Sequence, residues 1–127
     1  MKPGELEFIN KEFGESPDIH KSAMLQGLID LRYKVTIEKD VFFGFDVMIL
    51  TCGHDINKFG QERMGSGKGG PVTIHEGVFV ASRAMIIGPS EIGRNAVIGA
   101  GAVVKGNVPD YALMVGNPAI IKRIIKH

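Results

Sequence analysis

The chain has 127 residues, a net charge of +1 and 23% charged residues, which suits one domain and excludes an extended basic surface for nucleic acid. A single cysteine, Cys52, excludes an internal disulfide, and no apolar run reaches the roughly eighteen residues of a membrane span. These features predict one cytoplasmic domain, 1–127, with neither a nucleic-acid nor a membrane partner.

From residue 19 onward the chain follows a period of six residues. Segments 19–54 and 74–109 divide into hexads whose first residue is always apolar: Ile19, Leu25, Leu31, Ile37, Phe43, Ile49, Ile74, Val80, Ile86, Ile92, Ile98 and Val104. With 44% apolar residues overall, chance would give this succession roughly once in twenty thousand trials. The period therefore has a structural cause.

A period of six fits neither an α-helix nor a coiled coil. It fits a solenoid with three flat faces, in which each hexad supplies a short strand and a corner. Three hexads complete one coil, and the coils stack through parallel ladders. We therefore expect four coils, which span 19–36, 37–54, 74–91 and 92–109.

The repeat is interrupted between residues 55 and 73. This segment contains five glycines and no apolar periodicity, so we expect a loop that protrudes from the prism. His54 precedes the loop directly, where a rigid coil meets an adaptable arm. Histidine titrates nearest to neutral pH, so one fixed on a rigid edge can act as a general base. The residues alone leave open a second interpretation, a loop histidine bonded only to the backbone.

The last segment, 110–127, ends in the sequence NPAIIKRIIKH. Its isoleucines 120, 121, 124 and 125 fall on one face of a helix, and its basic residues fall on the other. This spacing predicts a short C-terminal helix.

The hexads, the segment GGPVTIHEGVFVAS after the loop, the sequence IGAGAVV and the closing VGNPA resemble the hexapeptide-repeat acyltransferases. The galactoside and maltose acetyltransferases and the polysaccharide O-acetyltransferases are the most similar types. The resemblance implies an all-β fold, a left-handed parallel β-helix, and a homotrimer with active sites between subunits. It also implies acetyl-CoA as co-substrate, a hydroxyl of a sugar-type acceptor, and no metal.

The resemblance further assigns roles to individual residues. His54 aligns with the catalytic histidine, which takes the acceptor's proton and later protonates the leaving thiolate. A backbone N–H near Ser82 would bind the oxyanion. The implied contacts of the co-substrate lie at Phe79, Ala81, Ser82, Ala100, Lys105 and Arg123.

Some positions depart from the family pattern, so the acceptor stays open. Phe79 stands where many relatives carry tryptophan, and Met24 stands where sugar acetyltransferases carry a pocket asparagine. The helical amino-terminal region of those enzymes is also missing or shortened. Alternatives are an N-acetyltransferase for an amino sugar nucleotide and a non-catalytic assembly subunit. A γ-type carbonic anhydrase would need three metal-binding histidines, which the spacing of the histidines does not supply.

Overall fold

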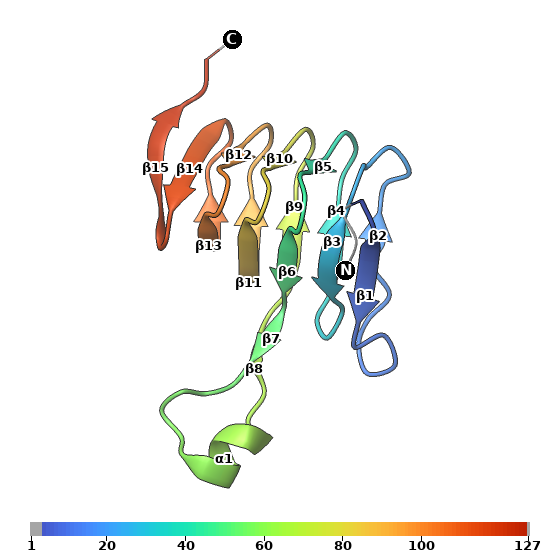
Figure 1. The fold of residues 1–127 in the computed structure, drawn as a ribbon, viewed down its shortest axis with the longest axis vertical. Helices are drawn as coiled ribbons and strands as arrows, with labels where there is room; N and C mark the ends of the chain where they lie inside the picture. The colour runs from blue at the N-terminus through green and yellow to red at the C-terminus, as the bar shows by residue number, and fades with distance from the viewer. Residues whose placement is uncertain (1–3, 127) are drawn as a thin grey trace.

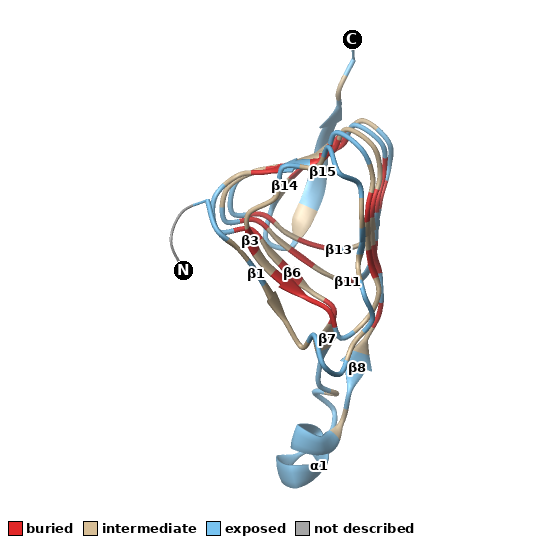
Figure 2. Cartoon of the chain, turned by 90° about the vertical axis from the view of Figure 1, so that its right-hand side faces the viewer, coloured by how far each residue is buried: buried red, intermediate tan, exposed pale blue. Residues whose placement is uncertain are grey.

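The structure is a computed structural model that describes residues 4–126. Short parallel strands wind into a β-solenoid of about six turns, and one arm projects from it (Figure 1). Figure 2 shows the triangular cross-section, with the buried residues distributed along the strands that form its walls. Each side of the triangle is a sheet that receives strands from successive turns, and we refer to the sides as face one, face two and face three.

Faces one and two share β11 and β13, which run around the corner between them. Face one stacks β1 (Leu6–Ile9), β3 (Gly27–Asp30), β6 (Met48–Leu50) and the first halves of β11 (Met85–Ile92) and β13 (Val103–Val108). Face two stacks β2 (Asp18–Ile19), β4 (Val35–Ile37), β9 (Val72–Ile74) and the second halves of β11 and β13. Face three stacks β5 (Phe42–Phe43), β10 (Phe79–Val80), β12 (Val97–Ile98), β14 (Ala112–Gly116) and β15 (Ala119–Ile124).

The residues that begin the hexads fill the interior. Ten of the twelve predicted first positions are buried, and Ile19 and Leu25 pack against the same core. On face one, for example, Ile49 and Ile86 are partners in adjacent turns. Branched side chains suit this stacking because they pack well on a pleated surface. The structure thus confirms the expected parallel β-helix with triangular coils.

Two features of the first turns were not predicted. Strand β1 pairs with β3 and so adds a turn before residue 19. The hexad phase also slips after Leu25, because Ile29 and not Leu31 is the partner of Ile49. The residues between Asp30 and Lys34 form an enlarged corner, and the buried side chain of Asp30 lies within it.

The predicted C-terminal helix is wrong. Residues 112–124 form an antiparallel hairpin in which β15 pairs with β14 at the end of face three. The turn holds Gly116 at a φ of 93° and is followed by Asn117 and Pro118. The exposed edge of β14 offers hydrogen bonds that an isolated helix could not match, and four isoleucines favour a strand over a helix.

The interruption of the repeat forms the expected protruding loop. Strands β7 (Cys52–Gly53) and β8 (Lys68–Gly69) pair as an antiparallel ribbon, and the short helix α1 (Gly60–Gly65) lies at its far end (Figure 1). No residue of α1 is buried, so the sequence carries no periodic signal for it. The arm leaves the prism at the corner between faces one and two (Figure 2).

Candidate active site

His54 lies on the arm, directly after β7. Its Nδ1 atom is 2.6 Å from the carbonyl oxygen of Ser66 on the opposite limb. A carbonyl can only accept, so Nδ1 carries the hydrogen and donates it. Atom Nε2 then holds the lone pair and is the atom that can take a proton from another molecule. The backbone N–H of Asp55 donates to Ser66 Oγ at 2.8 Å, which closes the ribbon around this histidine.

Glycines bring three chain segments close together at the base of the arm. The N–H of Gly70 donates to the carbonyl of Thr51 at 2.9 Å. A Cβ atom on Gly69 would lie 1.9 Å from that same carbonyl oxygen, and one on Gly88 would lie 2.1 Å from the carbonyl oxygen of Gly70. Only residues without a side chain allow these approaches. Gly69 and Gly88 are therefore required by the geometry of the arm's base.

The base of the arm borders a groove of about 600 Å³ on face one. Its apolar part comes from Leu50, Ile87 and Pro89, and its polar part comes from His54 and the two lysines Lys68 and Lys105. The structure thus places Lys105 along the same groove as His54. Two ammonium groups beside an apolar wall suit a ligand that carries both anionic and apolar parts.

The remaining predicted contacts lie elsewhere on the prism. Phe79 is on face three, where its ring stacks on Phe42 with centroids 4.6 Å apart and an angle of 15° between the planes. Ser82 and Ala100 follow β10 and β12, in the turns that lead from face three to face one. Ala81 directly precedes Ser82, and its N–H donates to the carbonyl of Ile98 at 2.8 Å. These four residues form one group, separated from His54 by the width of face one.

Ser82 is anchored through its side chain. The Phe45 N–H donates to Ser82 Oγ at 2.9 Å, and Gly44 packs so closely that a Cβ there would lie 2.6 Å from this oxygen. Within residues 4–126, no acceptor is found for the N–H of Ser82 itself. This donor can therefore serve another molecule.

Arg123 joins neither group. It lies on β15, pairs with Leu113 and is exposed. Asp55, the neighbour of His54, does not orient the imidazole: His54 Nδ1 is bound to the Ser66 carbonyl, and the Asp55 carboxylate accepts the N–H of Asn57 at 3.0 Å. The acceptor that does orient the imidazole is the Ser66 carbonyl, which no side-chain motif in the sequence could reveal.

The other described histidines are engaged away from this groove. His20 Nδ1 lies 2.9 Å from Ser22 Oγ, and the ring of His75 lies between Glu38 and Glu91 at 3.2 and 3.5 Å. Over the described part of the chain, no three His, Cys, Asp or Glu side chains gather as a metal site would require. No helix within residues 4–126 is long and apolar enough to cross a membrane.

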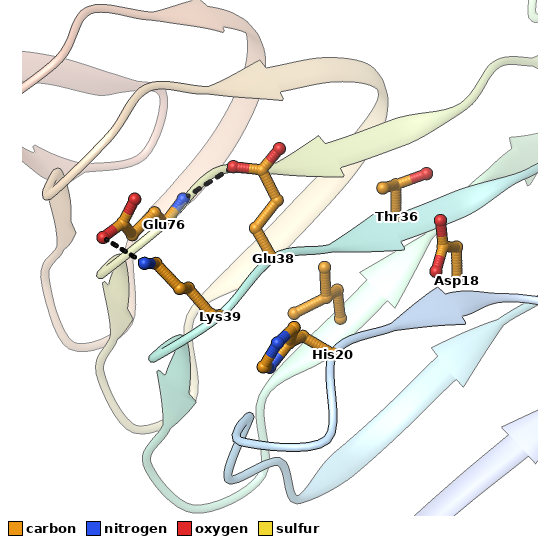
Figure 3. Close-up of a pocket in the computed structure, with 7 residues that line it drawn as sticks. Asp18, His20, Thr36, Glu38, Lys39 and Glu76 are labelled. Carbon is orange, nitrogen blue, oxygen red and sulfur yellow. Dashed lines mark hydrogen bonds and ion pairs between the residues drawn. The ribbon is translucent and has the colours of Figure 1, made fainter.

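A second hollow lies where β2, β4 and the end of β9 meet, and it shares no residue with the groove of His54. Figure 3 shows that three of its charged side chains are linked: Glu38 to the backbone of Glu76, and Lys39 to the Glu76 carboxylate. Glu38 accepts the N–H of Glu76 at 3.0 Å, and Lys39 Nζ lies 3.6 Å from the carboxylate of Glu76. These pairings engage the Glu38 and Glu76 carboxylates, and the one histidine that lines this hollow, His20, is not oriented as His54 is, because its Nδ1 accepts the Ser22 N–H at 3.1 Å.

Comparison with known proteins agrees with this fold. The family model for bacterial transferase hexapeptide repeats matches residues 71–106. A serine acetyltransferase of Buchnera aphidicola is 36% identical over 89% of this chain and 40% of its own length. A galactoside O-acetyltransferase of Lactococcus lactis is 32% identical over 72% of this chain and 44% of its own length. The chain thus spans less than half of these curated relatives.

A solved structure shows the same architecture. The hexapeptide-repeat acetyltransferase of Vibrio cholerae in complex with acetyl coenzyme A superposes with a TM-score of 0.76, at 21% identity, over 96% of this chain and 66% of that one. The repeat, the fold and the relatives agree: the chain carries the bacterial transferase hexapeptide repeat over residues 71–106, and it is similar in sequence and architecture to hexapeptide-repeat acetyltransferases.

Proposed function

We propose that the protein transfers an acetyl group from acetyl-CoA to a hydroxyl of a sugar or a sugar-containing acceptor. The observation that carries the proposal is the setting of His54, which lines the groove and whose Nδ1 is bound to the Ser66 carbonyl, so that Nε2 is left for another molecule. A histidine held in this tautomer is a ready general base. The relatives named as galactoside and serine acetyltransferases support the same chemistry.

In the proposed reaction, His54 Nε2 takes the proton of the acceptor hydroxyl as that oxygen attacks the thioester carbon. The Ser82 N–H donates to the oxyanion that forms, because this donor has no acceptor among the described residues. When the carbon–sulfur bond breaks, His54 returns the proton to the thiolate. The products are the acetyl ester and free CoA, and no covalent acyl-enzyme forms.

The proposed site needs two copies of the chain. His54 and Lys105 border one edge of face one, whereas Ser82 and Ala100 lie at its opposite edge. One prism cannot present both groups to a single thioester, because the width of a face separates them. We therefore propose a homotrimer in which one subunit supplies His54 and its neighbour supplies the turn at Ser82. The exposed ring of Phe45, 55% accessible beside that turn, supports a contact between subunits.

We also propose where the co-substrate binds. The contacts are Phe79, Ala81, Ser82, Ala100, Lys105 and Arg123. The small Ala100 leaves room along the turn for a thin chain, and Ser82 offers its N–H. Lys105 and Arg123 are exposed cations that suit phosphate groups. The neighbour solved with acetyl coenzyme A supports this choice of co-substrate.

The test is thiol release from acetyl-CoA with a panel of glycosides, nucleotide sugars and serine. We expect His54→Ala to lower turnover by roughly a hundred- to ten-thousand-fold on the acceptor that works. His20→Ala is the matched control and keeps the wild-type rate, because the His20 side chain bonds only to Ser22, two residues away. An undiminished rate for His54→Ala would exclude the histidine mechanism. Reaction only with amino sugars would replace O-acetylation by N-acetylation.

A further inference from the structure

Asp30 is a buried carboxylate that the proposed reaction does not use. It is 2% exposed, although carboxylates are rarely buried. Four donors converge on it. Asn10 Nδ2 and the Arg32 N–H reach Oδ1 at 2.7 and 3.0 Å, and the N–H groups of Thr51 and Cys52 reach Oδ2 at 3.0 and 3.1 Å.

These contacts identify the form in which Asp30 is held. Burial by itself would raise the pKa of Asp30, but the hydrogen bonds from Asn10, from the Arg32 N–H and from Thr51 together lower it below its ordinary value. All four donors point at the two oxygens, which suits a carboxylate that only accepts. A neutral acid or an amide at this position would oppose at least one donor.

The donors on Oδ2 belong to the point where the arm begins. Thr51 is the last residue of the coil, Cys52 is the first residue of β7, and His54 follows two positions later. Thr51 is held further, because its Oγ1 donates to the Asp30 carbonyl at 3.2 Å and accepts the Tyr33 N–H at 3.0 Å. The enlarged corner around Asp30 therefore holds the start of the outgoing limb of the arm by hydrogen bonds.

One of the two donors on Oδ1, the Asn10 amide, comes from the first turn of the solenoid. Asn10 follows β1 and has a φ of 60°, a conformation that Asn and Gly tolerate better than other residues. Its amide thus links the first turn to the base of the arm through a single carboxylate, across 20 residues of sequence.

We propose that Asp30 is a positioning residue that fixes the direction in which the arm leaves the prism and so holds His54 against its groove. Only the consequence for turnover rests on the proposed function. The restraint on the start of the arm follows from the hydrogen bonds of Asp30, and the mobility of this segment can be measured without any substrate.

Cys52 provides that measurement, because it is the only thiol in the chain and its own N–H is bound to Asp30. In Asp30→Asn an NH2 group replaces one carboxylate oxygen and faces a pair of donors with which it cannot bond. We therefore expect the start of the arm to become more mobile. We expect a maleimide to label Cys52 about tenfold faster or more, with a matching rise in hydrogen exchange at the Cys52 N–H relative to that of Ile86 in the coil. Turnover should fall by a similar factor while KM for acetyl-CoA stays unchanged.

Asp40→Asn is the matched control, because Asp40 is exposed at a corner that does not bear the arm. It should label and turn over as the wild type does. Asn10→Gly is the second variant, since glycine keeps the positive φ but removes the side-chain donor on Oδ1 and leaves the Arg32 N–H in place. It should accelerate labelling in the same direction by a smaller factor, and it carries the test if Asp30→Asn does not fold.

Wild-type labelling and exchange in folded Asp30→Asn, or in Asn10→Gly if that alone folds, would overturn the proposal. Loosening that is equal at Ile86 and Cys52 would overturn it too, because the carboxylate would then stabilise the fold generally. If His54→Ala retains activity while Asp30→Asn still loosens Cys52, the reaction assignment fails and the positioning role stands.

Discussion

Replacing Gly69 by alanine tests the close packing at the base of the arm. The new Cβ would lie 1.9 Å from the Thr51 carbonyl oxygen and 2.9 Å from the Cys52 Cα, so the two limbs must separate by about 1 Å or more to relieve the overlap. Such a shift breaks the 2.9 Å hydrogen bond from Gly70 to Thr51 and disturbs the pairing of β7 with β8.

The expected cost follows from these two effects. Overpacking costs about 1–3 kcal/mol and a lost backbone hydrogen bond about 1 kcal/mol, so the free energy of unfolding should fall by about 2–4 kcal/mol. Urea denaturation monitored by circular dichroism measures this value. Gly67→Ala is the matched control, because a Cβ on Gly67 meets no atom within 4 Å, and its unfolding free energy should change by less than about 0.5 kcal/mol. Equal stability of the two variants would refute the argument from close approach.

Two further predictions concern acid stability and the shared site. Because the pKa of folded Asp30 is below the ordinary 3.8, its contribution to stability is present at neutral pH and is lost as the pH falls through the lowered value. The slope of unfolding free energy against pH below about pH 4 should therefore be shallower in Asp30→Asn than in the wild type, and identical slopes would contradict this. For the shared site, His54→Ala and Ala100→Phe should each be inactive alone, but trimers of randomly mixed subunits should regain about a quarter of the wild-type rate. No recovery in mixed trimers, or a monomer by light scattering, would contradict a site between subunits.

The repeat could be predicted from the sequence because the interior of a prism needs one apolar side chain per strand. Ile37, Ile74 and Ile92 are buried on face two in register, as their spacing indicates. The turn at β1 was missed because Leu6 and Phe8 alternate in an open strand and do not continue the later hexads. The C-terminal hairpin was missed because the spacing of the isoleucines fits a helix, whereas the pairing with the edge of β14 depends on the tertiary structure.

The same reasoning predicts one part of the candidate site, the histidine, but not the group that orients it. The break in the repeat identified His54, since regular walls cannot accommodate a long glycine-rich segment. Its orienting partner could not be predicted, because the Ser66 carbonyl is backbone and lies twelve residues away. The role of Asp30 was hidden for a similar reason: two of its donors are the N–H groups of Thr51 and Cys52, which leave no trace in residue types.

The hairpin of β14 and β15 also affects the growth of the solenoid. A stack of parallel turns ends in a row of open hydrogen-bonding groups onto which another molecule could add without limit, as in a fibre. On face three, strand β15 runs in the reverse direction and occupies that row, and its Lys122 and Arg123 give the new boundary a positive charge. Two such boundaries repel each other, so the hairpin opposes the pairing of two C-terminal ends along this face.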